Sequence, residues 1–249
     1  MTLQNISAHS VGSTDARRPV AVLATTLTTC LVVAAFGASQ VQTAGTVLVG
    51  LVALFIGFQG IQTDCGWNAA VRTGGRTGHD HYTLAVHCLG LVLGALTTAT
   101  LLFLVGTAVH APAVVAVVAF PLLGLVRLGR PGTVMPGGWK VRRSWERFGT
   151  RPYLFVFGFF LGLGFVTTMA SPLAVAVAVW ALTGPPYVAV VAVLLCFALG
   201  RIVTTAAATW MDPGDRELES ANAVRAKTPR LVIIEGALAI AAGAVLFVT

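Results

Sequence analysis

Long apolar stretches without charge alternate with short polar segments along the chain. The longest, Tyr153–Leu182, contains 30 consecutive uncharged residues. As a single helix it would measure about 45 Å, well beyond a hydrocarbon core of roughly 30 Å. Proline inside a span removes a helix hydrogen bond and clashes with the preceding turn. We therefore predict a kink or break at Ser171-Pro172.

Seven stretches of this kind predict an all-α, polytopic membrane helix bundle. Residues 19–249 are expected to form a single transmembrane domain, after a polar, disordered cytoplasmic tail over residues 1–18. The longer polar segments 63–82, 129–152 and 211–230 are predicted as loops. The predicted spans are Pro19–Ala38, Thr43–Gln62, Thr83–Val109, Pro112–Leu128, Tyr153–Leu182, Tyr187–Trp210 and Leu231–Val248.

The positive charges predict the orientation of these spans. All 16 Lys and Arg residues lie in the N-terminal tail or in and beside the three loops, and the remaining turns contain none. Cytoplasmic segments of membrane proteins are enriched in Lys and Arg. Seven spans, with the N-terminus in the cytoplasm and the C-terminus outside, keep every positive charge on one side. We expect the protein to lie in the cytoplasmic (inner) membrane.

The composition narrows the classes of function. Hydrophobic residues make up 56% of the chain and charged residues 10%, with a formal net charge of +7. Because the aromatic residues lie mainly in apolar spans, the positive charge indicates cytoplasmic loops and not a nucleic-acid partner. The chain contains no P-loop, GxSxG or HExxH motif. Neither an enzyme activity nor a cofactor is therefore predicted, and the expected partner is the lipid bilayer.

The alternating orientation of the spans is compatible with an internal repeat. Spans two to four begin outside and spans five to seven begin inside, so the two groups form a 3+3 inverted repeat if their folds match. The clearest internal echo joins Gly90 and Gly94 in span three to Gly158 and Gly162 in span five. Those two spans run in the same direction, so the echo itself does not support inversion.

The same four glycines form two GxxxG pairs. In membranes such pairs let two helix backbones approach closely, because van der Waals packing replaces the hydrophobic drive. Helix packing is the simpler explanation of these pairs, and a lining of the substrate path is the alternative.

Polar residues inside the apolar spans are candidates for a substrate path. Thr167, Thr168 and Ser171 lie beside Pro172, where their hydroxyls either bond freed backbone carbonyls or form a polar site at the midplane. Glu235 is the only acidic residue inside an apolar span, and Arg201 lies inside span six. Ionisable residues in a membrane are costly and mark functional positions. The simpler alternative is a carboxylate near the interface that pairs with Arg201 or Arg230.

Residues that can bind metal ions gather over residues 63–88, in the loop after span two and the first turns of span three. Their spacing matches no tight zinc pattern, so a polar loop with incidental histidines is the simpler interpretation. A redox pair of Cys65 and Cys88 is a further alternative. The candidate ligands are Asp64, Cys65, His79, His81, His87 and Cys88.

The segment Phe157–Pro172 and the apolar segments that follow resemble the second half of the CcdA/DsbD transmembrane family, in the wider LysE-type exporter superfamily. The likeness covers about 60 residues and implies a 3+3 inverted repeat. In CcdA-like proteins it also implies transfer of reducing equivalents from cytoplasmic thioredoxin to thiols outside. That chemistry needs a cysteine next to proline, and here the matching residues are Ser171 and Pro172.

These observations lead to three functional hypotheses. The first is a small multipass carrier that moves a small solute or ion past the Thr167–Pro172 break, with Glu235 and Arg201 as coupling or gating charges. The second is a CcdA-like thiol–disulfide electron conduit. The third is a non-catalytic membrane subunit that forms a homo-oligomer or joins a larger membrane complex.

Overall fold

The computed structural model describes residues 43–62, 81–130, 147, 149–164, 171–210 and 217–248. Every regular element in these ranges is a helix, and none of them contains a strand. The predicted all-α class is therefore confirmed for the described part of the chain. The first predicted span, 19–38, lies outside it.

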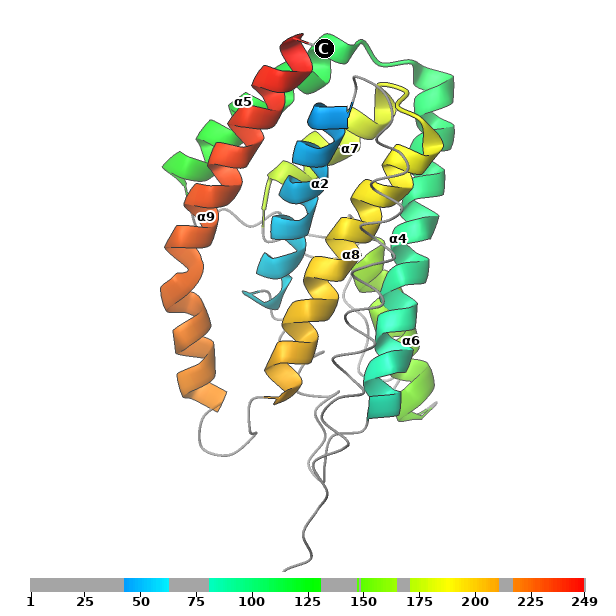
Figure 1. Ribbon diagram of the computed structural model, residues 1–249. Helices are drawn as coiled ribbons and strands as arrows, with labels where there is room; N and C mark the ends of the chain where they lie inside the picture. The colour runs from blue at the N-terminus through cyan, green and yellow to red at the C-terminus, as the bar shows by residue number, and fades with distance from the viewer. Residues whose placement is uncertain are drawn as a thin grey trace, which may run out of the picture.

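The helices follow the apolar stretches of the sequence (Figure 1). Among the described residues, three segments are long and apolar enough to cross a membrane: Tyr82–Val109, Tyr187–Ala207 and Arg230–Phe247. This is compatible with a membrane protein, and the arrangement of seven spans stays a prediction. The elements are α2 (Thr43–Phe58), η1 (Gln59–Gln62), α4 (His81–Val109), α5 (Ala113–Gly129), α6 (Thr150–Gly162), α7 (Leu173–Leu182), α8 (Tyr187–Trp210) and α9 (Glu217–Val248).

The fifth predicted span is divided into two helices. α6 ends at Gly162 and α7 begins only at Leu173, directly after Ser171-Pro172. Proline cannot donate a backbone hydrogen bond, and the Leu173 N–H is satisfied instead by the Ser171 Oγ at 3.2 Å. The predicted break therefore occurs at the expected place.

α9 begins much earlier than the sequence pattern predicts. The segment 211–230 was expected to be a loop, but α9 already starts at Glu217. Residues 217–227 are rich in Glu, Ala, Arg and Lys, which are strong helix formers even without an apolar face. The hydropathy pattern marks only the apolar part of this helix, and for that reason the prediction of a loop was wrong over 217–230.

α4 packs along α6 through glycines on both helices. A Cβ added to Gly94 would lie 2.1 Å from the backbone oxygen of Phe159, and one added to Gly162 would be as close to the α4 backbone. Gly90 and Gly158, one turn earlier on each helix, lie at the same contact. Any side chain at these positions would push the helices apart.

α2 packs along α8 in the same way. A Cβ added to Gly57 would lie 2.2 Å from the oxygen of Phe197, and one added to Gly200 would lie 2.3 Å from an α2 backbone oxygen. One end of this contact brings Gly50 against Cys196. The contact advances in the same direction along both helices, so α2 and α8 run parallel.

The remaining long contact joins α5 to α9, which lie side by side in Figure 1. Gly124 on α5 faces Gly236 on α9, and Pro121 faces Gly243. The main core lies between α2, α4, α5, α7, α8 and α9 and is built from small and branched apolar side chains with Phe120, Trp180 and Phe197. Large apolar side chains such as Leu104 and Leu122 are exposed, as expected for helices that face lipid.

Candidate functional site

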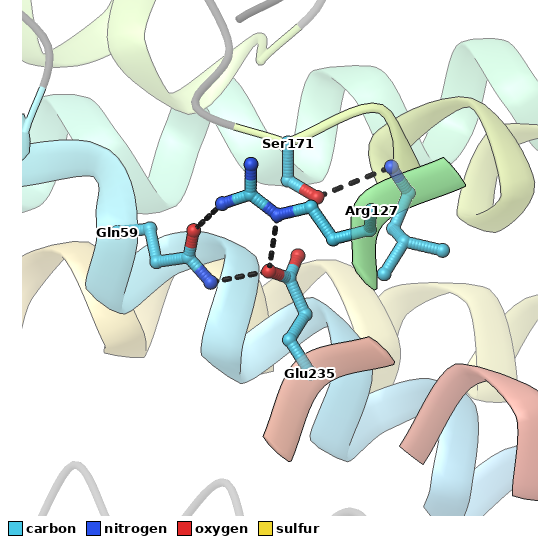
Figure 2. Close-up of polar contacts among 5 residues, drawn as sticks. Gln59, Arg127, Ser171 and Glu235 are labelled. Carbon is cyan, nitrogen blue, oxygen red and sulfur yellow. Dashed lines mark hydrogen bonds and ion pairs between the residues drawn. The ribbon is translucent and has the colours of Figure 1, made fainter. Parts of the chain in front are cut away.

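Four polar residues from separate segments meet inside the bundle, and we call them the polar cluster: Gln59, Arg127, Ser171 and Glu235. Gln59 begins η1 at the end of α2, Arg127 lies in the last turn of α5, Ser171 precedes α7, and Glu235 lies on α9. Each of the four is at most 1% exposed. Figure 2 shows their side chains converging on one point.

Hydrogen bonds join three members of the polar cluster in a closed triangle (Figure 2). The Arg127 Nε donates to the Glu235 Oε2 at 3.1 Å and forms an ion pair with it. The Arg127 Nη2 donates to the Gln59 Oε1, and the Gln59 Nε2 donates to the same Glu235 oxygen. The amide therefore bridges the two charges, which offsets part of the cost of burying them.

The second oxygen of Glu235 faces the Ser171 hydroxyl. The Oε1 atom is buried and forms no hydrogen bond of standard geometry with the described residues, while the Ser171 hydroxyl lies close enough to interact with this carboxylate. Figure 2 shows this oxygen on the side of Ser171, whose Oγ accepts the Leu173 N–H. Because a carboxylate oxygen can accept more than one hydrogen bond, a bound group that donates one would further stabilise the cluster.

Small residues bring the two charged helices together. Gly124 precedes Arg127 by three residues on the buried stripe of α5, and Gly236 directly follows Glu235 on α9. A Cβ at Gly124 would lie 3.0 Å from the oxygen of Gly236. The close approach of α5 and α9 thus places the guanidinium and the carboxylate within bonding distance.

A cavity of about 200 Å³ opens at the opposite ends of the same four helices. Its wall includes Thr46 of α2, Ala116 of α5, Trp180 of α7 and Leu246 of α9, with Thr183 at the turn after α7. The cavity and the polar cluster therefore lie in one compartment, bounded by α2, α5, α7 and α9.

The predicted path residues are only partly brought together. Ser171 and Glu235 both belong to the polar cluster, and Pro172 caps α7 beside them. Arg201 is buried on α8, where its guanidinium lies 5.2 Å from the centre of the Phe197 ring. The ion pair of Glu235 is formed with Arg127, whereas the sequence suggested Arg201 or Arg230. The remaining candidates, Thr167 and Thr168, lie outside the described residues.

Sequence reasoning missed Gln59 and Arg127. Arg127 was grouped with the basic loop that follows span four, although its neighbours on both sides are apolar. Ala116, Phe120 and Gly124 precede it at helical spacing, and together with Arg127 they form the buried stripe of α5. That spacing is the signal that could have placed Arg127 inside the bundle.

The candidate metal ligands are described only in part. Asp64, Cys65 and His79 lie outside the described residues, and His81 begins α4. His87 is buried against α6, where its Nδ1 donates to the Leu154 oxygen at 3.1 Å. Within the described ranges no three His, Cys, Asp or Glu side chains are placed to hold a metal ion. Metal binding by this group, with Cys88, stays a prediction.

The cysteines of the described ranges form no disulfide. Cys88 lies on α4 and Cys196 on α8, and both are partly buried. Cys30 and Cys65 lie outside those ranges.

Comparisons of the chain with models of protein families, with curated proteins and with solved structures found no match. The likeness to the CcdA/DsbD family therefore stays a prediction from the segment Phe157–Pro172 and the apolar segments that follow it.

Proposed function

We propose that the protein is an integral membrane carrier that moves a small solute or ion across the cytoplasmic membrane, and that the polar cluster is its binding site. The observation that carries this proposal is the buried Arg127–Glu235 pair, at the break between α6 and α7. Burying two charges costs several kcal/mol per ion before their attraction is counted. Charged residues inside membrane helices are retained mainly where they bind or conduct something.

An inverted repeat of α2, α4 and α5 against α6–α7, α8 and α9 is supported by the pairing of the helices. α2 packs along α8 as α4 packs along α6. The contact of Gly57 with Gly200 has the same backbone geometry as that of Gly162 with Gly94. If the two units are equivalent, Gly57 of the first corresponds to Gly162 of the second, and Gly94 corresponds to Gly200. The residues of each corresponding pair are separated by nearly the same number of positions in the sequence. Many carriers bind their substrate between two such units.

The chemistry of the polar cluster favours a ligand that donates hydrogen bonds or carries positive charge. Arg127 and Glu235 balance each other, and the Glu235 Oε1, beside the Ser171 hydroxyl, is a buried acceptor with capacity for a further hydrogen bond. A protonated amine, an alkali cation or a proton would each satisfy that oxygen. The ligand must also be small, because the polar cluster is enclosed by α2, α5, α7 and α9.

Flux into liposomes tests this proposal. The purified protein is reconstituted and challenged with gradients of H⁺, Na⁺, K⁺ and methylammonium, followed by entrapped ion-sensitive dyes and radiolabelled amine. Glu235→Gln should abolish the flux that the wild-type protein supports, because the acceptor charge is lost. Glu217→Gln, the same substitution at the start of the same helix, should leave it unchanged. Equal flux in the wild-type and Glu235→Gln proteins would reject the polar cluster as the binding site.

The same preparation separates the other two hypotheses. A thiol conduit requires cysteines. If the reconstituted protein transfers reducing equivalents across the membrane, and if replacing all four cysteines with serine abolishes that transfer, the conduit is favoured over a carrier. A non-catalytic subunit would support no flux and would co-purify with other chains. The GxxxG faces of α4 and α6 are occupied by each other, which leaves them unable to bind such a partner.

A further inference from the structure

The cavity and the polar cluster are connected by four buried helix stripes. On α5 the stripe runs from Ala116 at the cavity through Phe120 to Arg127. On α7 it runs from Trp180 at the cavity to Leu173, two residues from Ser171. α2 and α9 contribute equivalent stripes, which end at Gln59 and Glu235. The same four helices therefore enclose the compartment along its whole length, from the cavity to the polar cluster.

An apolar layer fills the compartment between the cavity and the polar cluster. Phe120 has the largest side chain of this layer and lies about 10 Å along α5 from Arg127, at the rise of an α-helix. The layer residues are fully buried and belong to one core cluster. They are Val49 and Val52 of α2, Phe120 of α5, Leu173 and Ala176 of α7, and Ala239 and Ala242 of α9.

We propose that the cavity is the outer half of the route to the polar cluster, and that Phe120 is the gate that closes this route in the present conformation. The proposal rests on the carrier function proposed above and adds the side of access and the residue that controls it. Phe120 is the bulkiest of the fully buried side chains between the cavity and the polar cluster, so a change of its rotamer would open the largest space in the apolar layer. The α9 residues of the same layer, Ala239 and Ala242, are small.

The predicted topology places this route on the outside of the membrane. The cavity is lined by the turn Thr183–Pro185 between α7 and α8. That turn contains no basic residue and is expected to face away from the cytoplasm. A ligand in the cavity would therefore exchange with the extracytoplasmic solution.

Thiol labelling in membrane vesicles tests the gate. The four native cysteines are replaced by serine, and single cysteines are introduced as Thr46→Cys in the cavity wall and Ser171→Cys in the polar cluster. A small membrane-impermeant cationic methanethiosulfonate is applied from either face. Thr46→Cys should react from the outer face, and Ser171→Cys should be protected there. Adding Phe120→Ala should raise the labelling rate of Ser171→Cys by about tenfold or more, because the substitution leaves a cavity in the layer.

Two further variants keep the test decisive. Phe247→Ala makes the same change at an exposed position of α9 and should leave the labelling of Ser171→Cys unchanged. Phe120→Leu is a milder change that should give an intermediate rate if Phe120→Ala does not fold, as judged by gel filtration in detergent. The proposal is rejected if Ser171→Cys labels from the outer face as fast as Thr46→Cys while Phe120 is present. It is also rejected if neither Phe120 variant changes the rate.

Labelling and flux can fail independently. Labelling that depends on Phe120, without flux of any ion tested, would retain the route and reject the carrier. Flux that Glu235→Gln abolishes, together with labelling that is indifferent to Phe120, would retain the carrier and reject the gate.

Discussion

At the scale of single residues, Arg127 and Glu235 form a buried ion pair in the bundle interior. Both side chains are at most 1% exposed, and each is the ionic partner of the other. Removing one partner of a buried pair strands the other charge, whereas replacing both with apolar residues of similar volume is often neutral. The contribution of the pair to stability can therefore be separated from its role in function by comparing the single and double replacements.

The first consequence is a non-additive stability pattern. Arg127→Met and Glu235→Leu should each lower the free energy of unfolding by about 3–5 kcal/mol, and the double variant should recover most of that loss. Denaturant titration in mixed micelles would measure all three. Arg230→Met, at an exposed position at the base of the apolar part of α9, should change stability by less than about 0.5 kcal/mol. Simple addition of the two single effects would contradict a direct ion pair.

Sequence alone predicted half of the polar cluster. Glu235 stood out because it is an acid in an apolar run, and Ser171 because it precedes a proline inside a span. Arg127 lies near the end of a span, where an arginine that faces a loop and one that faces the core look the same. Gln59 is uncharged and close to a predicted loop. Only the three-dimensional structure shows that the Gln59 and Arg127 side chains, at the ends of α2 and α5, point into the bundle.

At the scale of helices, the contacts between α4 and α6 and between α2 and α8 depend on backbone touching backbone. These approaches, at 2.1–2.3 Å from the position of a missing Cβ, leave no room for a methyl group. In a bilayer such packing is a main source of helix association. Each glycine at these contacts therefore contributes to stability because the absence of a side chain lets the two backbones touch.

A methyl group at Gly94 tests this contact. Gly94→Ala should destabilise the protein by about 1–3 kcal/mol, because α4 and α6 must move apart to accept it. Gly129→Ala is the matched control: nothing lies within 4 Å of the added Cβ, and the change should stay below about 1 kcal/mol. Thermal unfolding in detergent, followed by circular dichroism, would measure both. A Gly94 variant as stable as the control would show that the helices are not held at this distance.

The apolar pattern located these helices well but not all of their ends. α8 matches the predicted 187–210, and α2 with η1 matches 43–62. The apolar pattern did not predict the early start of α9, because the first turns of this helix are polar and form a helix through intrinsic propensity. The pattern also gave no pairing, since helices that are apolar on all sides have no preferred face.

At the scale of the whole molecule, the compartment between α2, α5, α7 and α9 extends from the cavity to the polar cluster. Figure 1 shows that α2 ends well short of the lower ends of α8 and α9. The polar cluster therefore lies deep within the bundle, where the chain breaks between α6 and α7. A binding site deep inside the bundle, at a broken helix, is the geometry that the proposed carrier function requires.

The predicted orientation can be checked with reporter fusions. Alkaline phosphatase fused after Thr249 should be active and green fluorescent protein at the same place dark, because the C-terminus is expected outside. Fusions within the basic loop after Gly137 should give the opposite result, since positively charged loops remain in the cytoplasm. A fluorescent C-terminal fusion with an inactive phosphatase would require an even number of spans.

The pairing of α2 with α8 also has a consequence for biosynthesis. The ribosome makes roughly 5–20 residues per second, so the chain from Gly57 to Gly200 takes on the order of ten seconds to complete. Among the described helices, α2 packs against α7, α8 and α9, and all three are made after it. During that interval the glycine face of α2 meets lipid or the insertion machinery instead of its final neighbour. A nascent chain that stalls before α8 would present this uncovered face to membrane quality control.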